Sequence, residues 1–181
     1  LFRHFAEFVD AKKPKAFVAE NVKGLITANK GKAIETIIKD FESIAPGYIV
    51  KPHLYNFAEY GVPQFRERIL FVGIRIDTGF DFIHPLPTHG PNGKYPYVTA
   101  GDALVGAKDV PYNNELINIK EKTRKMLEMI PEGGNFRDIP EDSPYHVKGM
   151  ISHVYRRIKL DEPAKTIIAL SVSCLTGLAR E

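Results

Sequence analysis

Hydrophobic and polar positions alternate with two different periods along the first 76 residues, which predicts helices and strands within the same stretch. Residues 1–11 carry apolar side chains at helical spacing. The expected inner face of this helix consists of Leu1, Phe5, Phe8 and Val9. Residues 33–44 repeat the helical spacing, and the proline and glycine that follow predict the end of this second helix. Each helix therefore has one apolar face to bury.

Three apolar runs of strand length lie between and after these helices. Residues 16–19 form a continuous apolar run, which fits a buried parallel strand. Residues 48–57 and 65–76 are separated by a short turn that contains glycine and proline, so we expect these two strands to pair antiparallel. Helices and strands in this order predict an α/β fold, with residues 1–77 as the closing part of a sheet.

The pattern changes near residue 77, where we place a domain boundary. Residues 81–97 are rich in proline and glycine and predict an irregular, loop-rich region. Residues 78–170 are expected to form a second domain of irregular α+β structure. The elements expected in it are a helix at 114–130 and short strands at 154–158 and 164–170. The origin of the tail, residues 171–181, is left open.

Composition narrows the class of protein. The 181 residues carry a net charge of +3, which permits a polyanionic partner. The single cysteine, Cys174, excludes a disulfide scaffold or a cysteine-based zinc site within the chain, and the histidine spacings match no common metal site. No apolar run is long enough to cross a membrane and no signal peptide opens the chain, so we expect a cytoplasmic protein.

The first candidate motif is the segment 14–25, in which a carboxylate follows an apolar strand. Glu20 and Asn21 stand where that strand ends. Open α/β sheets bind ligands just beyond the carboxyl ends of their strands, so Glu20 is well placed to act on a ligand. Taken alone, Glu20 and Asn21 are better explained as caps of the segment that follows.

The second candidate motif is the segment 60–69, in which arginines open an apolar strand. Strand alternation puts Gln64, Arg66 and Arg68 on one face. Two arginines at the mouth of a buried strand require carboxylates or phosphates nearby. A structural ion pair, for example between Arg66 and Glu20, would also satisfy this requirement.

Taken together and in this order, the two motifs resemble the DNA cytosine-C5 methyltransferase family. The stretch between them also fits, and weaker likenesses to the family's target-recognition domain occur at residues 130–140 and 155–167. The resemblance implies a Rossmann-like methyltransferase sheet followed by a target-recognition domain at about 78–170. It also implies methyl transfer from S-adenosyl-L-methionine to C5 of a cytosine flipped out of double-stranded DNA, as in restriction-modification systems. Such an enzyme is expected in the prokaryotic cytoplasm, at the nucleoid.

The same resemblance assigns roles to individual residues. Glu20 matches the family's catalytic glutamate, which protonates or hydrogen-bonds cytosine N3. Arg68 matches the arginine at cytosine O2, and Arg66 the arginine that orients the carboxylate or a phosphate. Asn21 is expected to shape the base pocket and Gln64 to bind substrate.

The resemblance also suggests where DNA is read. Candidate contacts are Arg156 and Arg157, with Lys148, His153 and Lys159. Basic residues at a DNA face touch phosphates more often than base edges. An equally weighted alternative is that the two arginines pair with carboxylates such as Asp161 or Glu162.

The chain departs from the family in two places. It has no Pro-Cys motif to supply the thiolate nucleophile and no glycine-rich S-adenosyl-L-methionine loop. We therefore expect a C-terminal fragment that by itself neither binds the cofactor well nor methylates DNA. The strand at residues 16–19 should then expose a sheet edge, so the chain is expected to dimerise or to need its N-terminal half or a complementing chain.

Three other functions stay open at this point. The chain could be a non-catalytic DNA-specificity subunit of a split methyltransferase. It could belong to an enzyme that methylates RNA cytosine by the same chemistry. A structural nucleotide-fold domain is the third alternative, although it leaves the paired motifs unexplained.

Overall fold

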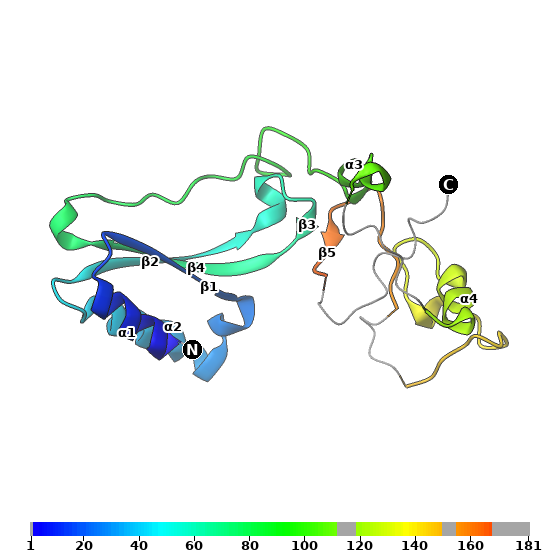
Figure 1. Ribbon diagram of the computed structural model, residues 1–181, viewed down its shortest axis with the longest axis horizontal. Coiled ribbons are helices and arrows are strands. Elements are labelled where there is room, and N and C mark those ends of the chain that lie inside the picture. The colour runs from blue at the N-terminus through cyan, green and yellow to red at the C-terminus, as the bar shows by residue number, and fades with distance from the viewer. Residues whose placement is uncertain (1, 112–118, 150–154, 168–181) are drawn as a thin grey trace. The chain divides into compact units, whose positions relative to one another are not determined.

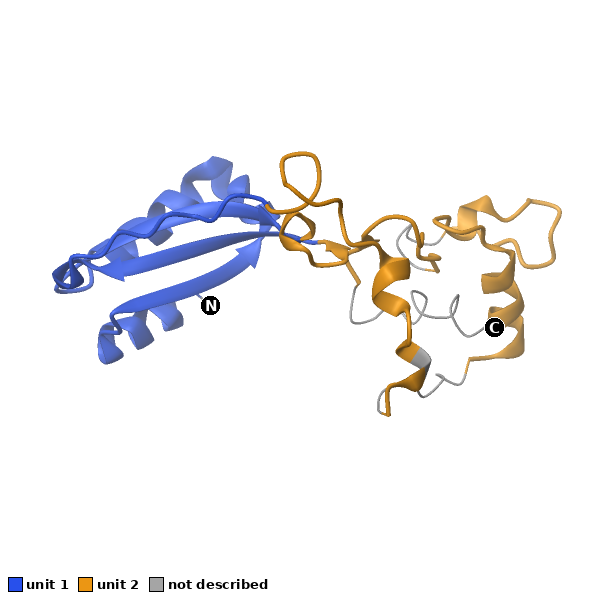
Figure 2. Ribbon diagram, turned by 90° about the horizontal axis from the view of Figure 1, so that it is seen from above, with its two compact units in different colours: residues 1–57, 66–87 blue, residues 58–65, 88–181 orange. Residues whose placement is uncertain are grey.

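The computed structural model describes residues 2–111, 119–149 and 155–167, and it contains two compact units (Figure 2). Unit 1 consists of residues 1–57 and 66–87, and unit 2 of residues 58–65 and 88–181. The turn at 58–65 thus belongs to unit 2, although the strands on either side of it belong to unit 1. The domain boundary at residue 77 stays a prediction.

The α-helices and strands of unit 1 are labelled in Figure 1. They are α1 (Phe2–Lys12), β1 (Ala16–Val22), α2 (Lys32–Glu42), β2 (Tyr48–Asn56) and β4 (Glu67–Arg75). Short 3-10 helices cover Lys23–Ile26, Ala28–Gly31 and Ile76–Thr78. The two helices expected at 1–11 and 33–44 are therefore present. No helix among the described residues of the whole chain is long and apolar enough to cross a membrane.

The strands of unit 1 form one sheet in the order β1-β4-β2. The expected antiparallel pairing of β2 with β4 is confirmed. β1 also runs antiparallel to β4, so the parallel pairing expected for residues 16–19 is wrong among the described residues. The apolar run misled because β1 buries one face only: Phe17 and Ala19 are buried, whereas Val18 is 61% exposed.

One face of the sheet packs against α1 and α2 and forms the core of unit 1 (Figure 1). The rings of Phe17 and Phe41 lie 4.6 Å apart at its centre, and Phe71 is fully buried beside them. A Cβ atom on Gly73 would lie 2.2 Å from the Phe17 ring, so this position of β4 requires glycine. The large aromatic side chains thus fix how closely the helices approach the sheet.

Among the described residues, the inner face of α1 differs from the expected one at Phe8 and Phe2, and the expected Leu1 lies outside those residues. Val9 is buried and Phe5 packs on the core, as predicted. Phe8 is 57% exposed, and Phe2 packs on the core in its place, 5.6 Å from the ring of Phe71. Residues 2, 5 and 9 follow the i, i+3, i+7 spacing of one helix face, and residue 8 does not.

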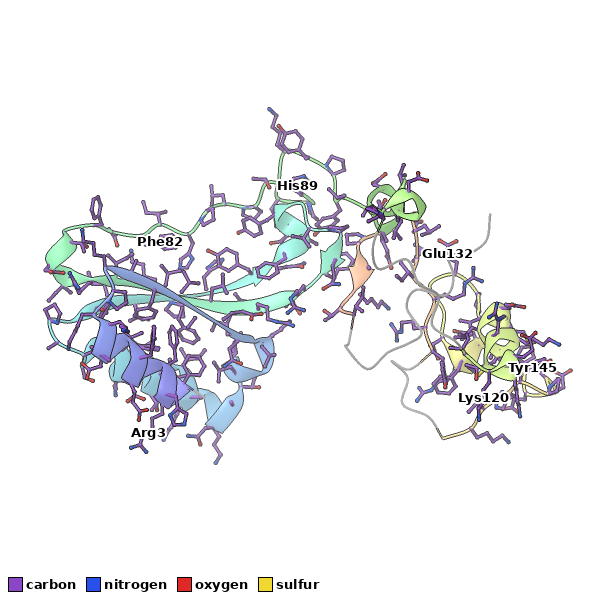
Figure 3. All side chains as sticks on the ribbon, viewed as in Figure 1. Arg3, Phe82, His89, Lys120, Glu132 and Tyr145 are labelled. Carbon is purple, nitrogen blue, oxygen red and sulfur yellow. The ribbon has the colours of Figure 1, made fainter. Side chains whose placement is uncertain are left out.

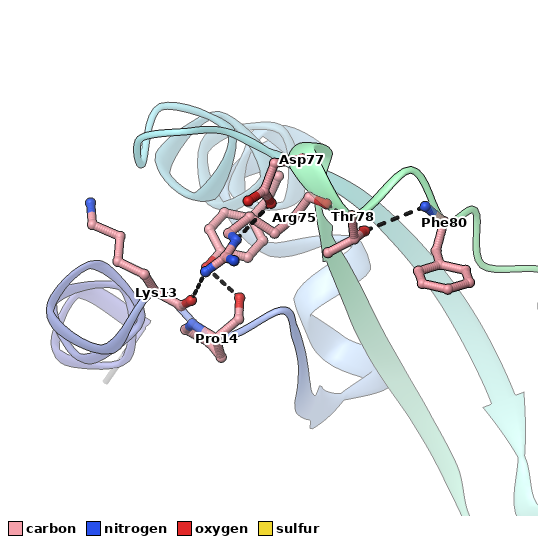
Figure 4. Close-up of polar contacts among 7 residues, drawn as sticks. Lys13, Pro14, Arg75, Asp77, Thr78 and Phe80 are labelled. Carbon is pink, nitrogen blue, oxygen red and sulfur yellow. Dashed lines mark hydrogen bonds and ion pairs between the residues drawn. The ribbon is translucent and has the colours of Figure 1, made fainter.

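The end of β4 is fastened to the chain that leads into β1 (Figure 4). The Arg75 guanidinium donates to the carbonyl of Lys13 and, from Nε, to Oδ1 of Asp77 at 2.7 Å. Hydrogen bonding by Arg75 lowers the pKa of Asp77 below its ordinary value. Thr78 Oγ1 donates to the carbonyl of Arg75 at 2.7 Å and accepts from Phe80 N–H at 3.4 Å. The chain therefore turns sharply where β4 ends.

Residues 79–87, here called the strap, then contact the outer side chains of β2, and Phe82 marks the strap in Figure 3. Lys51 Nζ pairs with Asp81 and donates to the carbonyl of Phe82 at 2.8 Å. The imidazole of His84 stacks on that of His53, with ring centres 4.7 Å apart. Polar and aromatic contacts thus hold the strap along one strand.

The described residues of unit 2 form two α-helices and a small sheet. Its elements are β3 (Gln64–Phe65), α3 (Ala100–Leu104), α4 (Glu121–Met129) and β5 (Ala164–Lys165), with 3-10 helices at Phe57–Tyr60, Ala107–Asp109 and Phe136–Asp138. β3 pairs parallel with β5. A capping box between Thr99 and Asp102 starts α3. The core around α4 comprises Met126, Leu127, Ile130, Phe136 and Ile139.

Several expectations for unit 2 need correction. The helix expected from residue 114 begins at Glu121, although residues 112–118 lie outside the described part. Of the strand expected at 154–158, the described residues form only an isolated bridge between Asn135 and Arg156. Of the strand at 164–170, Ala164–Lys165 is present and 168–170 are not described. Tertiary pairing, not local pattern, decides such short strands.

The buried aromatic core predicts a large, position-specific loss of stability. We expect Phe71→Ala to lower the free energy of unfolding by about 3–5 kcal/mol, because it removes a fully buried ring and leaves a cavity. Urea denaturation followed by circular dichroism measures this loss. Phe8→Ala is the matched control, and its effect should stay within about 0.5 kcal/mol because the ring is largely exposed. Equal losses in both variants would contradict the packing described.

The strap predicts a pH-dependent stability. Burial lowers the pKa of His84, nearby His53 lowers it further, and the backbone of Lys51 opposes both. The unfolded chain therefore binds this proton more tightly, so the stability present above about pH 6.5 should fall as the pH drops through the folded-state value. Urea midpoints at about pH 7.5 and 5.5 should differ less in His84→Asn than in the parent. Phe8→Ala, which changes an exposed side chain on α1 that carries no titratable group, should leave the difference unchanged.

Candidate active site

Glu20 lies near the carboxyl end of β1, on the sheet face opposite the helices. Strand alternation follows from its neighbours, since Phe17 and Ala19 face the core. Its Cα pairs with that of Leu70, and the next pair on the same face is Val22 with Arg68. Diagonal neighbours on one face of an antiparallel pair lie within reach of long side chains. The register of β1 on β4 therefore brings Arg68 to Glu20.

The carboxylate of Glu20 contacts two guanidinium groups. Its Oε1 lies 2.7 Å from Nε of Arg68 and 3.7 Å from Nη2 of Arg66. Arg68 also donates from Nη1 to the carbonyl of Glu67 at 2.8 Å. The Arg68 side chain is 15% exposed, whereas Glu20 is 47% exposed. One well-held arginine thus orients a carboxylate that solvent or a ligand can still reach.

This arrangement suits a planar, polar ligand. A guanidinium has five N–H donors, so Arg68 has capacity beyond its two contacts. A carboxyl group both donates and accepts hydrogen bonds, depending on its protonation. Charge-assisted hydrogen bonds from Arg66 and Arg68 would favour a ligand that gains negative charge. The ion pair foreseen between Arg66 and Glu20 is present, but the shorter contact is with Arg68.

The strand expected at 65–76 is interrupted at Arg66. β3 ends at Phe65 and β4 begins at Glu67, while the Arg66 carbonyl accepts from Phe57 N–H at 3.0 Å. Gln64 belongs to β3 of unit 2, where it pairs with Ala164. Strand alternation therefore does not connect Gln64 with Arg68, and the shared face expected for them is corrected in this respect.

Asn21 lies beside Glu20 but on the next strand position. Its Oδ1 accepts a hydrogen bond from Val22 N–H at 2.8 Å. Alternation directs the side chains of Glu20 and Asn21 to opposite faces of β1. A role for Asn21 in shaping a base pocket stays a prediction.

The two motifs share an ion pair that their sequences do not reveal. Lys23 Nζ lies 2.7 Å from Oε1 of Glu67 and joins the end of β1 to the start of β4. Only the pairing register of these strands could have indicated it. Glu67 also accepts a hydrogen bond from Arg68, through its backbone carbonyl and not through the carboxylate that pairs with Lys23.

The basic residues suggested for DNA contact lie in several environments of unit 2. Arg157 Nη1 donates to the carbonyl of Ile130 at 2.9 Å, and Arg156 is half-buried in its bridge with Asn135. Lys159, not an arginine, pairs with Asp161 at 3.0 Å, which raises the pKa of Lys159. Lys148 is exposed, and His153 lies outside the described residues.

The described residues contain no cluster of histidine, cysteine, aspartate and glutamate side chains that could hold a metal ion. Cys174 lies outside the described residues. The site at Glu20 is therefore built from a carboxylate and guanidinium groups.

Unit 1 combines an α/β sheet with a carboxylate held by arginines near the end of one strand. A crystal structure of an Escherichia coli prophage-encoded protein, assigned as a DNA modification methyltransferase, has the same fold: the TM-score is 0.53 at 19% identity, over 90% of this chain and 55% of that one. The family model for C-5 cytosine-specific DNA methylase matches residues 1–172. The chain belongs to this family.

Two curated relatives extend the comparison. The type II methyltransferase M.NgoFVII of Neisseria gonorrhoeae is 65% identical over 172 residues, which are 93% of this chain and 46% of that protein. The type II methyltransferase M.BbvI of Brevibacillus brevis is 42% identical over 171 residues, 92% of this chain and 45% of the relative. The chain thus spans about half the length of the curated relatives it matches.

Proposed function

We propose that the protein to which this chain belongs is a restriction-modification DNA methyltransferase that methylates C5 of a flipped-out cytosine. The observation that carries the proposal is the contact of one carboxylate, Glu20, with both arginines of the second motif, Arg66 and Arg68. The family membership and the type II relatives support the same reaction class.

The chemistry explains why these groups belong together. Cytosine C5 is a poor nucleophile until a thiolate adds to C6, and that addition needs a proton or hydrogen bond at N3. We assign this role to Glu20. Arg68 would donate to O2, where negative charge develops, and Arg66 would keep the carboxylate oriented. Preorganised donors of this kind stabilise developing charge without reorganising during the reaction.

The remaining components of the reaction would come from elsewhere. S-adenosyl-L-methionine would supply the methyl group when bound. This sequence contains no Pro-Cys dipeptide, so we propose that the thiolate comes from a further segment or a complementing chain, and that the 181 residues alone are inactive. Duplex DNA is the proposed substrate, with the target-recognition role assigned to residues 78–170. Asn21, Gln64, Arg156 and Arg157 are proposed as substrate-binding residues.

A kinetic test separates the catalytic role of Glu20 from DNA binding. In the protein that carries the nucleophile, Glu20→Gln should lower kcat by a factor on the order of 10²–10⁴, the usual worth of a general acid or base. The dissociation constant for DNA should change little, because the amide keeps the shape of the carboxylate. Tritium transfer to cognate DNA gives kcat, and bisulfite mapping of host DNA verifies the C5 product.

Glu7→Gln, an exposed carboxylate on α1, is the matched control and should leave kcat unchanged. The proposal fails if the parent protein produces no 5-methylcytosine, or if Glu20→Gln and Glu7→Gln are equally active.

We further propose that β1 is an edge through which the chain associates. Among the described residues, β1 pairs on one side only, with β4. Unpaired strand edges template pairing with another chain. In concentrated solution the isolated chain should therefore show the mass of two chains in light scattering. Val18→Lys, which places a charge on the exposed face of β1, should shift it towards the monomer.

Phe8→Lys removes an equally exposed apolar side chain from α1 and is the matched control, so it should leave the association unchanged. A monomer at all concentrations, with every β1 amide protected from hydrogen exchange, would refute the edge proposal.

A further inference from the structure

The inference concerns what holds Arg68 in place, and it rests on the proposed function. Arg68 lies on the central strand, so it has a same-face neighbour on each side. Its Cα partners are Val22 on β1 and Tyr55 on β2. Directly opposite side chains have Cβ atoms about 5 Å apart, so the Arg68 stem lies between an isopropyl group and a phenol ring. Tyr55 is 6% exposed and is the larger of these two flanks.

Tyr55 is itself fixed by the strap. Its Oη lies 2.5 Å from Nδ1 of His84. The His53 ring stands edge-on to Tyr55 with centroids 4.7 Å apart, and it stacks on His84 at the same centroid distance. The Phe82 ring also contacts His84, in a perpendicular arrangement with ring centres 5.0 Å apart. The phenol therefore has little freedom to move away from β4.

The strap cannot easily shift, because a second contact with β2 lies four residues before Tyr55. Lys51 Nζ contacts both Asp81 and the carbonyl of Phe82. The contacts at Lys51 and His84 fix the strap at two points on the same face of β2. Figure 3 shows the strap passing above the sheet with Phe82 labelled.

We propose that Tyr55 and His84 are positioning residues for Arg68, and that their hydrogen bond holds the phenol as a wall that directs the guanidinium to Glu20. An arginine side chain loses rotamer entropy when it is held in one geometry, so a fixed flank that removes wrong rotamers lowers the cost of the productive one. Tyr55 lies in the stretch between the two motifs, and His84 lies after the second motif.

Tyr55 and His84 support Arg68 best when the His84 ring is uncharged. The polar groups near His84 are Tyr55, His53 and Lys51 of β2, and Lys51 is paired with Asp81 of the strap. Burial and nearby His53 lower the pKa of His84, which keeps the ring neutral. A neutral ring can form one hydrogen bond with the Tyr55 hydroxyl through Nδ1. A protonated imidazole would add a cation close to Lys51.

The test measures Arg68 directly in the 181-residue chain, with no need for activity. Hydrogen exchange of the Arg68 Nε–H is followed by nitrogen-15 NMR, because this proton lies in the 2.7 Å contact with Glu20. Tyr55→Phe and His84→Leu should speed exchange by about fivefold, the factor that corresponds to losing one ordinary hydrogen bond. His84→Asn, whose neutral amide replaces the ring nitrogen, should restore slow exchange.

The matched control is Tyr48→Phe on the same strand. Tyr48 Oη donates to the carbonyl of Pro14 at 2.7 Å, on the helix-covered face. This variant loses a comparable hydrogen bond and should leave Arg68 exchange unchanged. If Tyr48→Phe speeds exchange as much as Tyr55→Phe does, the effect is general loosening and the positioning role is overturned. Unchanged exchange in both Tyr55→Phe and His84→Leu overturns it as well.

A kinetic arm keeps this inference distinct from the proposed function. In the protein with the nucleophile, Tyr55→Phe and His84→Leu should lower kcat about fivefold with the DNA dissociation constant unchanged, and His84→Asn should recover kcat. If the parent protein does not methylate cytosine, the proposed function is refuted, while the hydrogen-exchange measurement on Arg68 still decides the positioning role. If the parent methylates cytosine and kcat is unaltered in both Tyr55→Phe and His84→Leu, the positioning role alone is refuted.

Discussion

β4 is paired with a neighbouring strand on both sides, and this double pairing determines where the candidate side chains lie. Its inner residues, such as Phe71, face the helices, and its outer residues include Arg68. A slip of one residue would exchange the two sets. It would drive a guanidinium into the aromatic core and bring a phenylalanine into water. The cost of that exchange fixes the register, and the register fixes the distance between Arg68 and Glu20.

The ion pair at the site adds little to that stability. Glu20 is about half exposed, and exposed pairs contribute between zero and about 1 kcal/mol. The geometry therefore comes from strand pairing and from flanking side chains such as Tyr55. The carboxylate of Glu20 therefore stays accessible to a ligand. The buried rings on the opposite face keep the strands that carry Glu20 and Arg68 rigid. Stability and chemistry are thus assigned to opposite faces of one sheet.

Local periodicity predicted the structural features that are determined by residues close together in the sequence. Both helices of unit 1 and the antiparallel β2–β4 pair follow from such patterns, and so does the nearness of Glu20 to the arginines once the family resemblance is included. The direction of β1, the break at Arg66 and the roles of Tyr55 and His84 depend on residues distant in sequence. An apolar run has the same pattern in parallel and antiparallel strands, and the proline-rich strap has no hydrophobic periodicity. These features required the pairing register.

The charges on the outer face explain why a tyrosine–histidine contact is suited to position Arg68. Two arginines and Lys51 share this face with the carboxylates of Glu20 and Asp81. A cationic support beside Arg68 would repel it, and an anionic one would compete with Glu20 for its hydrogen bonds. A neutral phenol held by a neutral imidazole does neither. It restricts Arg68 by shape alone and leaves the carboxylate of Glu20 as its nearest charged partner.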